Sequence, residues 1–403
     1  MSPAEIGKLM PERRWLRFTP DRLIGGLLVL EGLLLLSEHF RWFAFNQHKG
    51  WTVLIAVASV GVAMVVMLLW FAVALLFRCR FQFSVRSLLV LTVAVAIACS
   101  WWATETQQAK KQREAVEEIK KLGVEVNRVY YDSVSDYCFP DKEEPPEPAW
   151  LRSLAGDDFF TDVVNITFYD HQVTDAALEH LKGLPQLRAL SLEGTPITDA
   201  GLKNLKRLPQ LRSLVLASTK ITDAGLRDII GSLQLEDLFL DNVSVTDAGL
   251  EHVEGLSKLR RLSLNDTMVT DTGVERLKEL NQLVVLCLSD TKVTNTGLEH
   301  LKGLDQVQYL WLSSTKITDA GLEHLRGLTN LRFLLLNKTP VTDVGLEHLK
   351  GLGQLWWLDL THTKVTAGGI KKLQQALPNC KIKWEPPTSD EQQNPATPAQ
   401  PGG

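Results

Sequence analysis

The sequence predicts an α/β solenoid that is preceded by three transmembrane helices. The first observation is a 24-residue pattern that is written nine times between Val163 and Trp384. Repetition at a fixed period of this length is typical of solenoids, in which each copy buries its apolar face against its neighbours. The second observation is a set of three apolar runs within residues 23–103, before the repeats begin.

Composition limits the classes of function. The chain has 403 residues and a formal net charge of −4, so there is no overall electrostatic reason to expect a nucleic acid as a partner. The five cysteines have neither the spacing of a metal site nor the density of a disulfide framework, although a single bridge remains open. We therefore expect no metal, no cofactor and no nucleic-acid partner.

The order of segments follows from these features. We predict helices at about 23–43, 51–77 and 85–102. The predicted parts are a cytoplasmic tail 1–22, a membrane domain 23–103, a juxtamembrane helix and linker 104–149, a repeat domain 150–384 with nine repeats and end caps, and a disordered tail 385–403.

The membrane assignment depends mainly on the second run. Residues 51–77 contain no charged side chain, and about 20 apolar residues are enough to span a bilayer. The first run has a signal peptide as its alternative, but it starts late and no small-x-small cleavage pattern follows it, so we expect it to stay uncleaved. The third run, with Ser84 to Ser87 included, approaches the length of a span.

Glu31 interrupts the first apolar run. A carboxyl group is costly in lipid, so such a residue is a functional candidate. The structural alternatives are a protonated or hydrogen-bonded Glu31 that faces the other spans, or a helix that lies closer to the membrane surface.

Basic residues near the spans predict the orientation. Eight Lys and Arg residues lie in the N-terminal tail and the second loop, against about five on the other side. The N-terminus is then cytoplasmic, and the repeat domain of this multi-pass protein is extracytoplasmic. The eight are Lys8, Arg13, Arg14, Arg17, Arg22, Arg78, Arg80 and Arg86, and the five are Arg41, Lys49, Lys110, Lys111 and Arg113.

The connector from Thr104 to Leu122 is rich in helix-forming residues and carries a thin apolar stripe. We interpret it as a helix that is either an isolated, solvated stalk, which we favour slightly, or paired with a second copy. Solenoids also need a cap over each open end. We expect the cap at the N-terminal end to come from Trp150, Leu151 and Leu154, which precede Phe159 and Phe160.

Each repeat predicts a short strand followed by a helix. In the copy that begins at Leu259, the inward Leu262 and Leu264 alternate with Arg261 and Ser263. Stacked copies would form a parallel sheet. The copies begin at Val163, Leu187, Leu211, Leu235, Leu259, Leu283, Val307, Leu331 and Leu355.

Three polar columns run through the copies. A Thr follows each strand and can bond turn backbone; His171 and Val243 are the exceptions. A Thr-Asp pair then begins the helix, with Thr as N-cap and Asp placed favourably at the positive helix end. A Gly in the first helical turn suggests that another backbone segment packs closely there. The glycines are Gly201, Gly225, Gly249, Gly273, Gly297, Gly321 and Gly345.

Two copies depart from the pattern. Ser232 replaces the last leucine of the third copy and Leu233 follows it, which predicts a shifted turn. In the last copy Ala367 replaces the Asp, and residues 380–384 after it predict a terminal half-strand.

The strand L-x-x-L-x-L followed by ITDAGLEHLKGL resembles leucine-rich repeats, with Thr where the most similar subclass has Cys. This resemblance implies a leucine-rich-repeat solenoid with a parallel sheet on its concave face and helices on its convex face. The segments FSVRSLLVLTVAVAIACSWWA, AKKQREAVEEIKKLG and WLRSLAGDDFFTDVV resemble membrane-anchored leucine-rich-repeat proteins of planctomycete bacteria. That second resemblance implies a location rather than an activity.

No catalytic motif stands out, and we do not expect an enzyme. A Glu-His pair recurs at one helix position; stacked histidines could bind metal, but copies of a solvent-facing residue explain them better. The only feature in favour of an enzyme is Cys287, which we expect to be exposed on its strand without a nearby His.

The concave face of the last three repeats carries the best candidate site. Its outward residues change there from small to aromatic, and a contiguous aromatic patch is typical of a binding hot spot. The alternatives are that a tail or cap covers the patch, or that the rings only fill a curved sheet. The candidate residues are Tyr309, Trp311, Phe333, Leu335, Asn337, Trp357, Asp359 and His362.

These features predict a membrane-anchored scaffold that binds a protein or peptide partner on its concave face. The alternative is a signalling or transport-associated membrane subunit in which the repeats act as sensor, and Glu31 is its support in the sequence.

Overall fold

A computed structural model describes residues 20–40, 51–76, 85–121, 125–129, 157–168, 173–229 and 234–386. The chain divides into two compact units, residues 1–113 with 128–162 and residues 114–127 with 163–403, which are described separately. Several predictions lie outside the described residues. They concern the basic residues of segment 1–19, the loop residues 41–50 and 78–80, Cys79, Cys138, Trp150, Leu151, Leu154, His171, Ser232, Leu233 and the tail 387–403.

The first unit contains α2 (Pro20–Phe40), α3 (Trp51–Leu76), most of α4 (Val85–Lys121) and α6 (Asp157–Phe160). Buried residues on α2 and α3 recur at alternating intervals of three and four, the spacing of helices that pack along one seam. Leu27 packs in a cluster with alanines of α3 and α4, and such small side chains let apolar helices approach closely. The buried residues are Ile24, Leu27, Glu31 and Leu34 on α2, and Val53, Ala56, Val60, Ala63 and Met67 on α3.

Two described helices are long and apolar enough to cross a membrane. The candidate spans are Thr52–Leu69 in α3 and Leu89–Lys121 in α4. The apolar part of α2 is shorter and covers Ile24–Leu34. The described residues therefore contain two candidate spans, and a span formed by the first apolar run, at about 23–43, stays a prediction.

Helix α4 is continuous over 37 residues and joins two elements that the sequence suggested as separate. In its last turns, Ala115, Val116 and Ile119 are buried in the same apolar core as the repeats. The interpretation of this segment as an isolated stalk is therefore wrong, because the end of α4 covers the core at its N-terminal side.

Phe159 and Phe160 belong to the core of the first unit. Both are buried in the first unit, in a cluster with Val53 and Ala109. The ring of Phe159 lies 5.0 Å from that of Trp102, centre to centre. The predicted cap residues, which precede these phenylalanines, lie outside the described residues.

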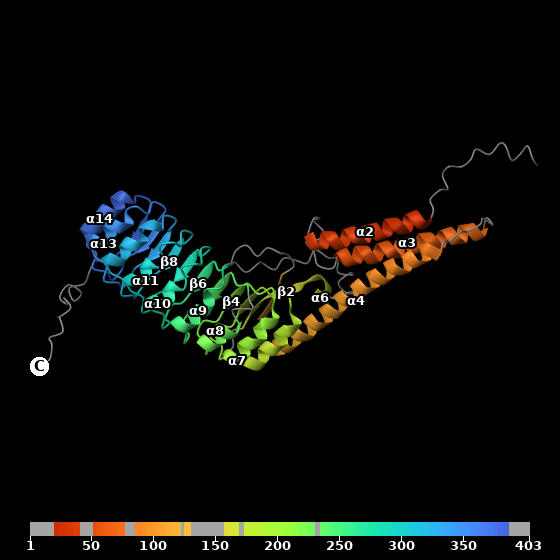
Figure 1. Ribbon diagram of the computed structural model, residues 1–403, viewed down its shortest axis with the longest axis horizontal. Helices are drawn as coiled ribbons and strands as arrows, with labels where there is room; N and C mark the ends of the chain where they lie inside the picture. Colours follow the sequence, from red (N-terminus) through yellow and green to blue (C-terminus); the bar gives the residue numbers. More distant parts are fainter. Residues whose placement is uncertain are drawn as a thin grey trace, which may run out of the picture. The chain divides into compact units, whose positions relative to one another are not determined.

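Eleven strands form one sheet in sequential order, and β2 to β10 belong to the nine repeats (Figure 1). Pairs from β2 to β11 are parallel, and register partners are 24 residues apart, as Leu262 and Leu286 are. This register confirms the predicted parallel sheet and the half-strand at its end. The strands are β1 (Glu125–Val129), β2 (Asp162–Thr167), β3 (Ala189–Ser191), β4 (Ser213–Val215), β5 (Asp237–Phe239), β6 (Arg261–Ser263), β7 (Val285–Cys287), β8 (Tyr309–Trp311), β9 (Phe333–Leu335), β10 (Trp357–Asp359) and β11 (Lys381–Lys383).

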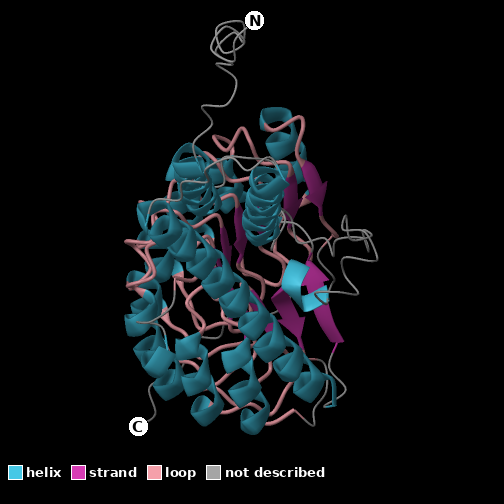
Figure 2. Ribbon diagram, turned by 90° about the vertical axis from the view of Figure 1, so that its right-hand side faces the viewer, coloured by secondary structure: helices cyan, strands magenta, loops and turns pink. Residues whose placement is uncertain are grey.

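A short helix follows most strands, and the helices lie on the side of the repeat solenoid opposite to the sheet (Figure 2). Leu262 and Leu264 of the sheet are fully buried, as are Leu202 and Leu205 of the helical side. The helices are η3 (Asp175–Gly183), α7 (Asp199–Leu202), η4 (Lys203–Arg207), α8 (Asp223–Ile229), α9 (Asp247–Val253), α10 (Asp271–Glu275), α11 (Asn295–Glu299), α12 (Asp319–Leu322), η6 (Glu323–Gly327), α13 (Asp343–Leu349) and α14 (Ala367–Ala376).

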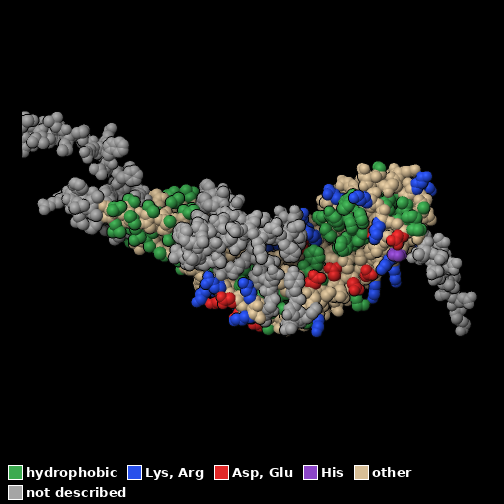
Figure 3. Space-filling model, turned by 180° about the vertical axis from the view of Figure 1, so that it is seen from behind, with side chains coloured by type: hydrophobic (Ala, Val, Ile, Leu, Met, Phe, Trp, Pro, Cys, Tyr) green, Lys and Arg blue, Asp and Glu red, His purple; other side chains and the backbone are tan. Residues whose placement is uncertain are grey.

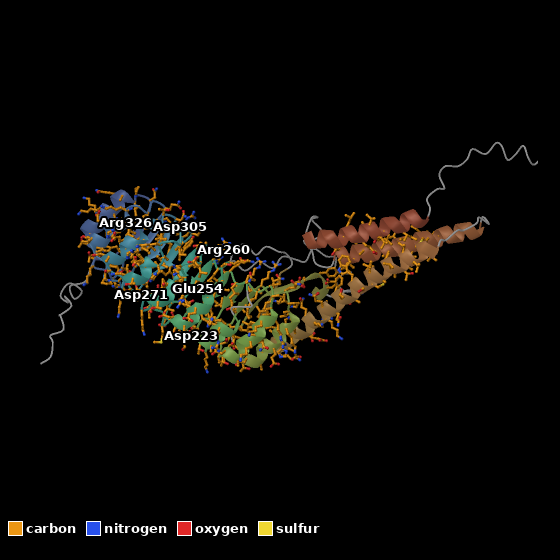
Figure 4. All side chains as sticks on the ribbon, in the orientation of Figure 1. Asp223, Glu254, Arg260, Asp271, Asp305 and Arg326 are labelled. Carbon is orange, nitrogen blue, oxygen red and sulfur yellow. The ribbon has the colours of Figure 1, made fainter. Side chains whose placement is uncertain are left out.

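The Thr-Asp pairs have a second function that the sequence did not reveal. Thr294 caps its helix as predicted, because its Oγ1 accepts a hydrogen bond from the amide of Thr296. The carboxylate of the preceding repeat's Asp271 accepts hydrogen bonds from the backbone N and the Oγ1 of Thr294, at 2.7 and 2.6 Å. Equivalent pairs, among them those of Asp223 and Asp271 labelled in Figure 4, join successive repeats.

The recurring glycine makes room for this carboxylate. A Cβ atom added to Gly297 would lie 2.6 Å from Oδ1 of Asp271, and one added to Gly273 would lie 2.4 Å from Oδ1 of Asp247. The prediction of close packing is confirmed, but the close neighbour is a carboxylate rather than backbone.

The Thr that follows each strand donates its hydroxyl to a carbonyl three residues earlier, as Thr267 does to Leu264 at 2.7 Å. The residue before this Thr has a positive φ, for example 57° at Lys338 and 55° at His362. This tight turn ends each strand and directs the chain toward the helical side.

Candidate functional site on the concave sheet face

Three aromatic residues occupy equivalent positions on adjacent strands. Tyr309 of β8 is the register partner of Phe333 of β9, and Phe333 is the register partner of Trp357 of β10. Two residues further along, Trp311 is the partner of Leu335. Because side chains alternate along a strand and the intervening leucines are buried, these residues all point away from the core.

Phe333 is the centre of an aromatic cluster. Its ring centre lies 6.1 Å from Tyr309, 6.5 Å from Trp311 and 6.0 Å from Trp357. The ring of Trp357 stacks on it with an interplanar angle of 5°. Contacts of this kind fix the rings in place and leave little freedom to lose on binding.

Trp356 also belongs to this cluster, although the sequence pattern did not indicate it. Its ring lies 6.1 Å from those of both Phe333 and Trp357, and 43% of the residue is exposed. Trp356 precedes β10 by one position, so strict alternation of side chains does not place it among the residues that point away from the core. The Trp-Trp pair itself was the available signal. We call Tyr309, Trp311, Phe333, Trp356 and Trp357 the aromatic cluster.

The polar candidates are held in other ways. Asp359 is buried, and its carboxylate accepts hydrogen bonds from Thr361 and from Nζ of Lys383, the latter at 3.3 Å. Asn337 accepts a hydrogen bond from the hydroxyl of Ser313. His362 is exposed in the turn that follows β10.

Asn337 is the last member of a polar ladder beside the strands. Side-chain contacts link Asp241 to Asn265 and Asn265 to the amide of Ser289. Ser289 then accepts from the amide of Ser313, which donates its hydroxyl to Asn337. The ladder satisfies polar groups along one edge of the concave face and supports a structural function for Asn337.

A hollow of about 340 Å³ lies next to the aromatic cluster. Arg260 and Arg261 form one wall, Tyr309 and Trp311 form the other, and the lining is completed by the valines 284 and 285. Apolar and aromatic surfaces therefore meet two guanidinium groups at one place.

Two acidic side chains on and beside β5 are already paired with arginines. Asp237 lies 3.3 Å from Nε of Arg261, and Glu236 lies 2.9 Å from Nη1 of Arg212. Within the described residues, by contrast, Arg260 and Arg332 have no side-chain hydrogen bond or ion pair, and both are exposed. Figure 4 shows Arg260 on the strand side of the solenoid, and Figure 3 shows an apolar patch of the repeats with Lys and Arg side chains at its edge.

Cys287 is not the exposed thiol that the sequence suggested. It is 4% exposed, and burial raises the pKa of its thiol to about 12. A thiol of this kind is a weak nucleophile at neutral pH. Across the part of the chain that the structure describes, no three His, Cys, Asp or Glu side chains are grouped as metal ligands would be.

A family model described as "Leucine Rich repeat" matches residues 208–229. The matched segment has about the length of one repeat, and the nine copies share one period and one strand register. The chain carries leucine-rich repeats. Its repeats carry the strand, turn and helix that the sequence resemblance implied.

Two solved internalin structures are similar to part of this chain. Internalin C2 (inlC2) from Listeria monocytogenes is 20% identical, with 58% of this chain and 89% of that chain covered and a TM-score of 0.36. Internalin inlF from the same organism is 16% identical, with 58% and 92% covered and a TM-score of 0.33. Among curated proteins, none matches this sequence.

Proposed function

We propose that this leucine-rich-repeat protein is a membrane-anchored scaffold that binds a protein or peptide partner through its aromatic cluster. The observation that supports this most directly is the arrangement of four rings around Phe333 on the outward face of the sheet. Trp and Tyr are enriched among the residues that dominate binding energy at protein interfaces.

Exposure separates this cluster from the rest of the concave face. Trp311 is 36% exposed and Trp356 is 43% exposed. The corresponding positions in β3 and β4 carry small residues such as Ala189 and Ser213. Large apolar side chains that stay exposed beside one another are typical of interaction surfaces.

The proposed test changes the cluster and leaves the core intact. Full-length protein with Trp311→Ala and Phe333→Ala should lose the partners that are crosslinked to the wild type in native membranes, because truncating two such anchors commonly costs more than about 2 kcal/mol each. Phe239→Ala is the matched control, since Phe239 is an aromatic residue on the same face in β5. Partner capture that survives the double change with unchanged thermal unfolding excludes the cluster as the binding site.

The membrane part of the proposal has three spans with a cytoplasmic N-terminus and extracytoplasmic repeats. It is supported by the buried residues of α2 and α3, which recur at intervals of three and four, and by the distribution of Lys and Arg along the sequence. A topology reporter fused after Trp384 should be active only outside the cytoplasm. Activity confined to the cytoplasm would reverse the orientation.

A second candidate function is that of a signalling or transport-associated membrane subunit with the repeats as sensor. It is favoured by Glu31, which is 1% exposed and whose carboxyl oxygens have no hydrogen-bond partner among the described residues. An unsatisfied carboxyl group in a membrane helix needs an explanation beyond packing. If Glu31→Gln leaves every cellular phenotype of the protein unchanged, this candidate loses its support.

A further inference from the structure

We infer that the partner of the aromatic cluster is an extended acidic peptide. In this inference, carboxylates of the peptide pair with Arg260 and Arg332, and an apolar side chain between them fills the hollow beside Tyr309 and Trp311. The inference rests on the proposed function and adds the chemistry of the ligand.

The charges beside the cluster favour an acidic partner. Asp237, Glu236 and Asp359 already neutralise cations of this chain, at 3.3, 2.9 and 3.3 Å from Arg261, Arg212 and Lys383. Arg260, Arg332 and Lys381 have no such partner among the described residues. The positions where β6, β9 and β11 begin therefore offer positive charge that has no ion-pair partner in the described part of the chain and is complementary to carboxylates.

The two arginines also set a spacing. Arg260 and Arg332 occupy the position just before β6 and β9, and the amide of each bonds to the chain one strand earlier. Strands lie about 4.8 Å apart, so three strand steps separate the two by roughly 14 Å. An extended peptide rises about 3.3 Å per residue and covers this distance in about four residues. An acid at each end of a five-residue segment fits both arginines.

The hollow lies between these two positions. It is about 340 Å³ in volume, near the lower limit of ligand pockets, and suits one large side chain rather than a whole cofactor. Its lining combines Val284 and Val285 with the aromatic wall, so an apolar residue is favoured there. An anchor in the hollow places the flanking carboxylates toward the guanidinium groups.

A peptide explains the site better than an acidic glycan. The rings of the cluster are tilted by 34–60° in all but one pair, and the stacked pair covers one face of Phe333. They therefore form a knobbed apolar surface rather than a series of open flat platforms. A guanidinium group binds a carboxylate with two parallel hydrogen bonds, which an aspartate or glutamate side chain can provide.

A selection experiment tests the inference even while the partner is unidentified. A library of random heptapeptides is displayed and selected on the full-length protein in lipid nanodiscs. The expected result is enrichment of a five-residue pattern. Its first and last residues are Asp or Glu, and its central residue is apolar. For the most enriched peptide, Arg260→Glu or Arg332→Glu should weaken binding by at least about tenfold, since each removes a charge-assisted hydrogen bond.

The controls separate this inference from the proposed function. Arg207→Glu makes the same charge change at an exposed site on the helical side, and should leave binding within about threefold because salt screens distant charges. One outcome overturns the acidic peptide but keeps the cluster as the binding site. In that outcome, the selected peptides are apolar and lose binding with Trp311→Ala and Phe333→Ala. They contain no enriched acids, or their binding does not depend on Arg260 and Arg332. If the selected peptides bind equally well to the variant with Trp311→Ala and Phe333→Ala, both the acidic peptide and the cluster as binding site are overturned. Binding of oligogalacturonate with the same arginine dependence, in the absence of enriched peptides, would replace the peptide with an acidic glycan.

Discussion

The carboxylate of Asp247 lies where a side chain on Gly273 of the next repeat would be. Oδ1 of Asp247 is 2.4 Å from the position of a Cβ on Gly273, and the same carboxylate accepts hydrogen bonds from N and Oγ1 of Thr270 at 2.8 and 2.6 Å. The Thr, Asp and Gly of each repeat therefore belong to one contact between neighbours. This contact holds the helical side of the solenoid in the same register as the strands.

Gly273→Ala should destabilise the repeat domain by about 1–3 kcal/mol, because the new methyl group displaces the carboxylate and overpacks the site. Leu250 and Val269 lie 3.0 Å from the same Cβ position and leave no room on the other sides. Urea unfolding of the full-length protein measures the loss. Gly303→Ala is the control, since its Cβ would meet nothing within 4 Å, and it should be neutral or slightly stabilising. Equal effects of the two substitutions would contradict the explanation.

Asn295→Asp should stabilise the junction between α11 and α12 by about 1 kcal/mol. Asn295 stands in the Asp column, and its Nδ2 donates to Oγ1 of Thr318, which makes no cap hydrogen bond. A carboxylate would accept from that hydroxyl instead and leave Oγ1 available to cap α12.

Amide hydrogen exchange in α12 should slow in the Asn295→Asp variant. The reverse change, Asp271→Asn, is its matched control and should accelerate exchange in α11, whose Thr294 is bound by that carboxylate. If the amide exchange rates of α11 and α12 stay unchanged in both variants, the direction of the hydrogen bond at the Thr hydroxyl is not important for stability.

Ile119→Ala should cost about 2–5 kcal/mol, because it leaves a cavity where α4 covers the first repeats. Ile119 is fully buried in the core of the repeats. The neighbouring Lys120 is exposed, so Lys120→Ala should change the unfolding free energy by less than about 0.5 kcal/mol. Thermal unfolding followed through the repeats would show the difference, and equal stability of both variants would mean that α4 does not act as the cap.

Cys287 should react slowly with iodoacetamide at pH 8 in the folded protein. Burial raises its thiol pKa from 9.0 to about 12, so the thiolate that reacts is scarce. We expect alkylation at least about a hundredfold slower than in guanidinium chloride, as followed by mass spectrometry of the Cys287 peptide.

The same shift has a consequence for stability. The folded state holds the neutral thiol of Cys287 and the unfolded chain ionises first, so its contribution is full below pH 9.0 and decreases as the pH rises toward 12. A folded-state alkylation rate equal to the unfolded one would contradict the burial of this thiol.

Much of the site was predictable for one reason. The period of 24 residues gives every strand the same register, so the outward positions Tyr309, Phe333 and Trp357 had to lie side by side. Trp356 was missed because it lies before the strand, where alternation no longer determines direction. Asp359 satisfied the pattern for the site but is buried, since Lys383 and Thr361 surround its carboxylate.

The sequence by itself determined the repeat, the buried leucines, the Thr N-caps and the position of the aromatic residues, because all of these depend on spacing along the chain. Only the tertiary structure decided that Asp271 bonds to Thr294, that Gly297 accommodates that carboxylate and that Ile119 covers the repeats. These contacts join residues 23 or more positions apart, and local pattern carries no information about which partner a side chain meets across a stacked interface.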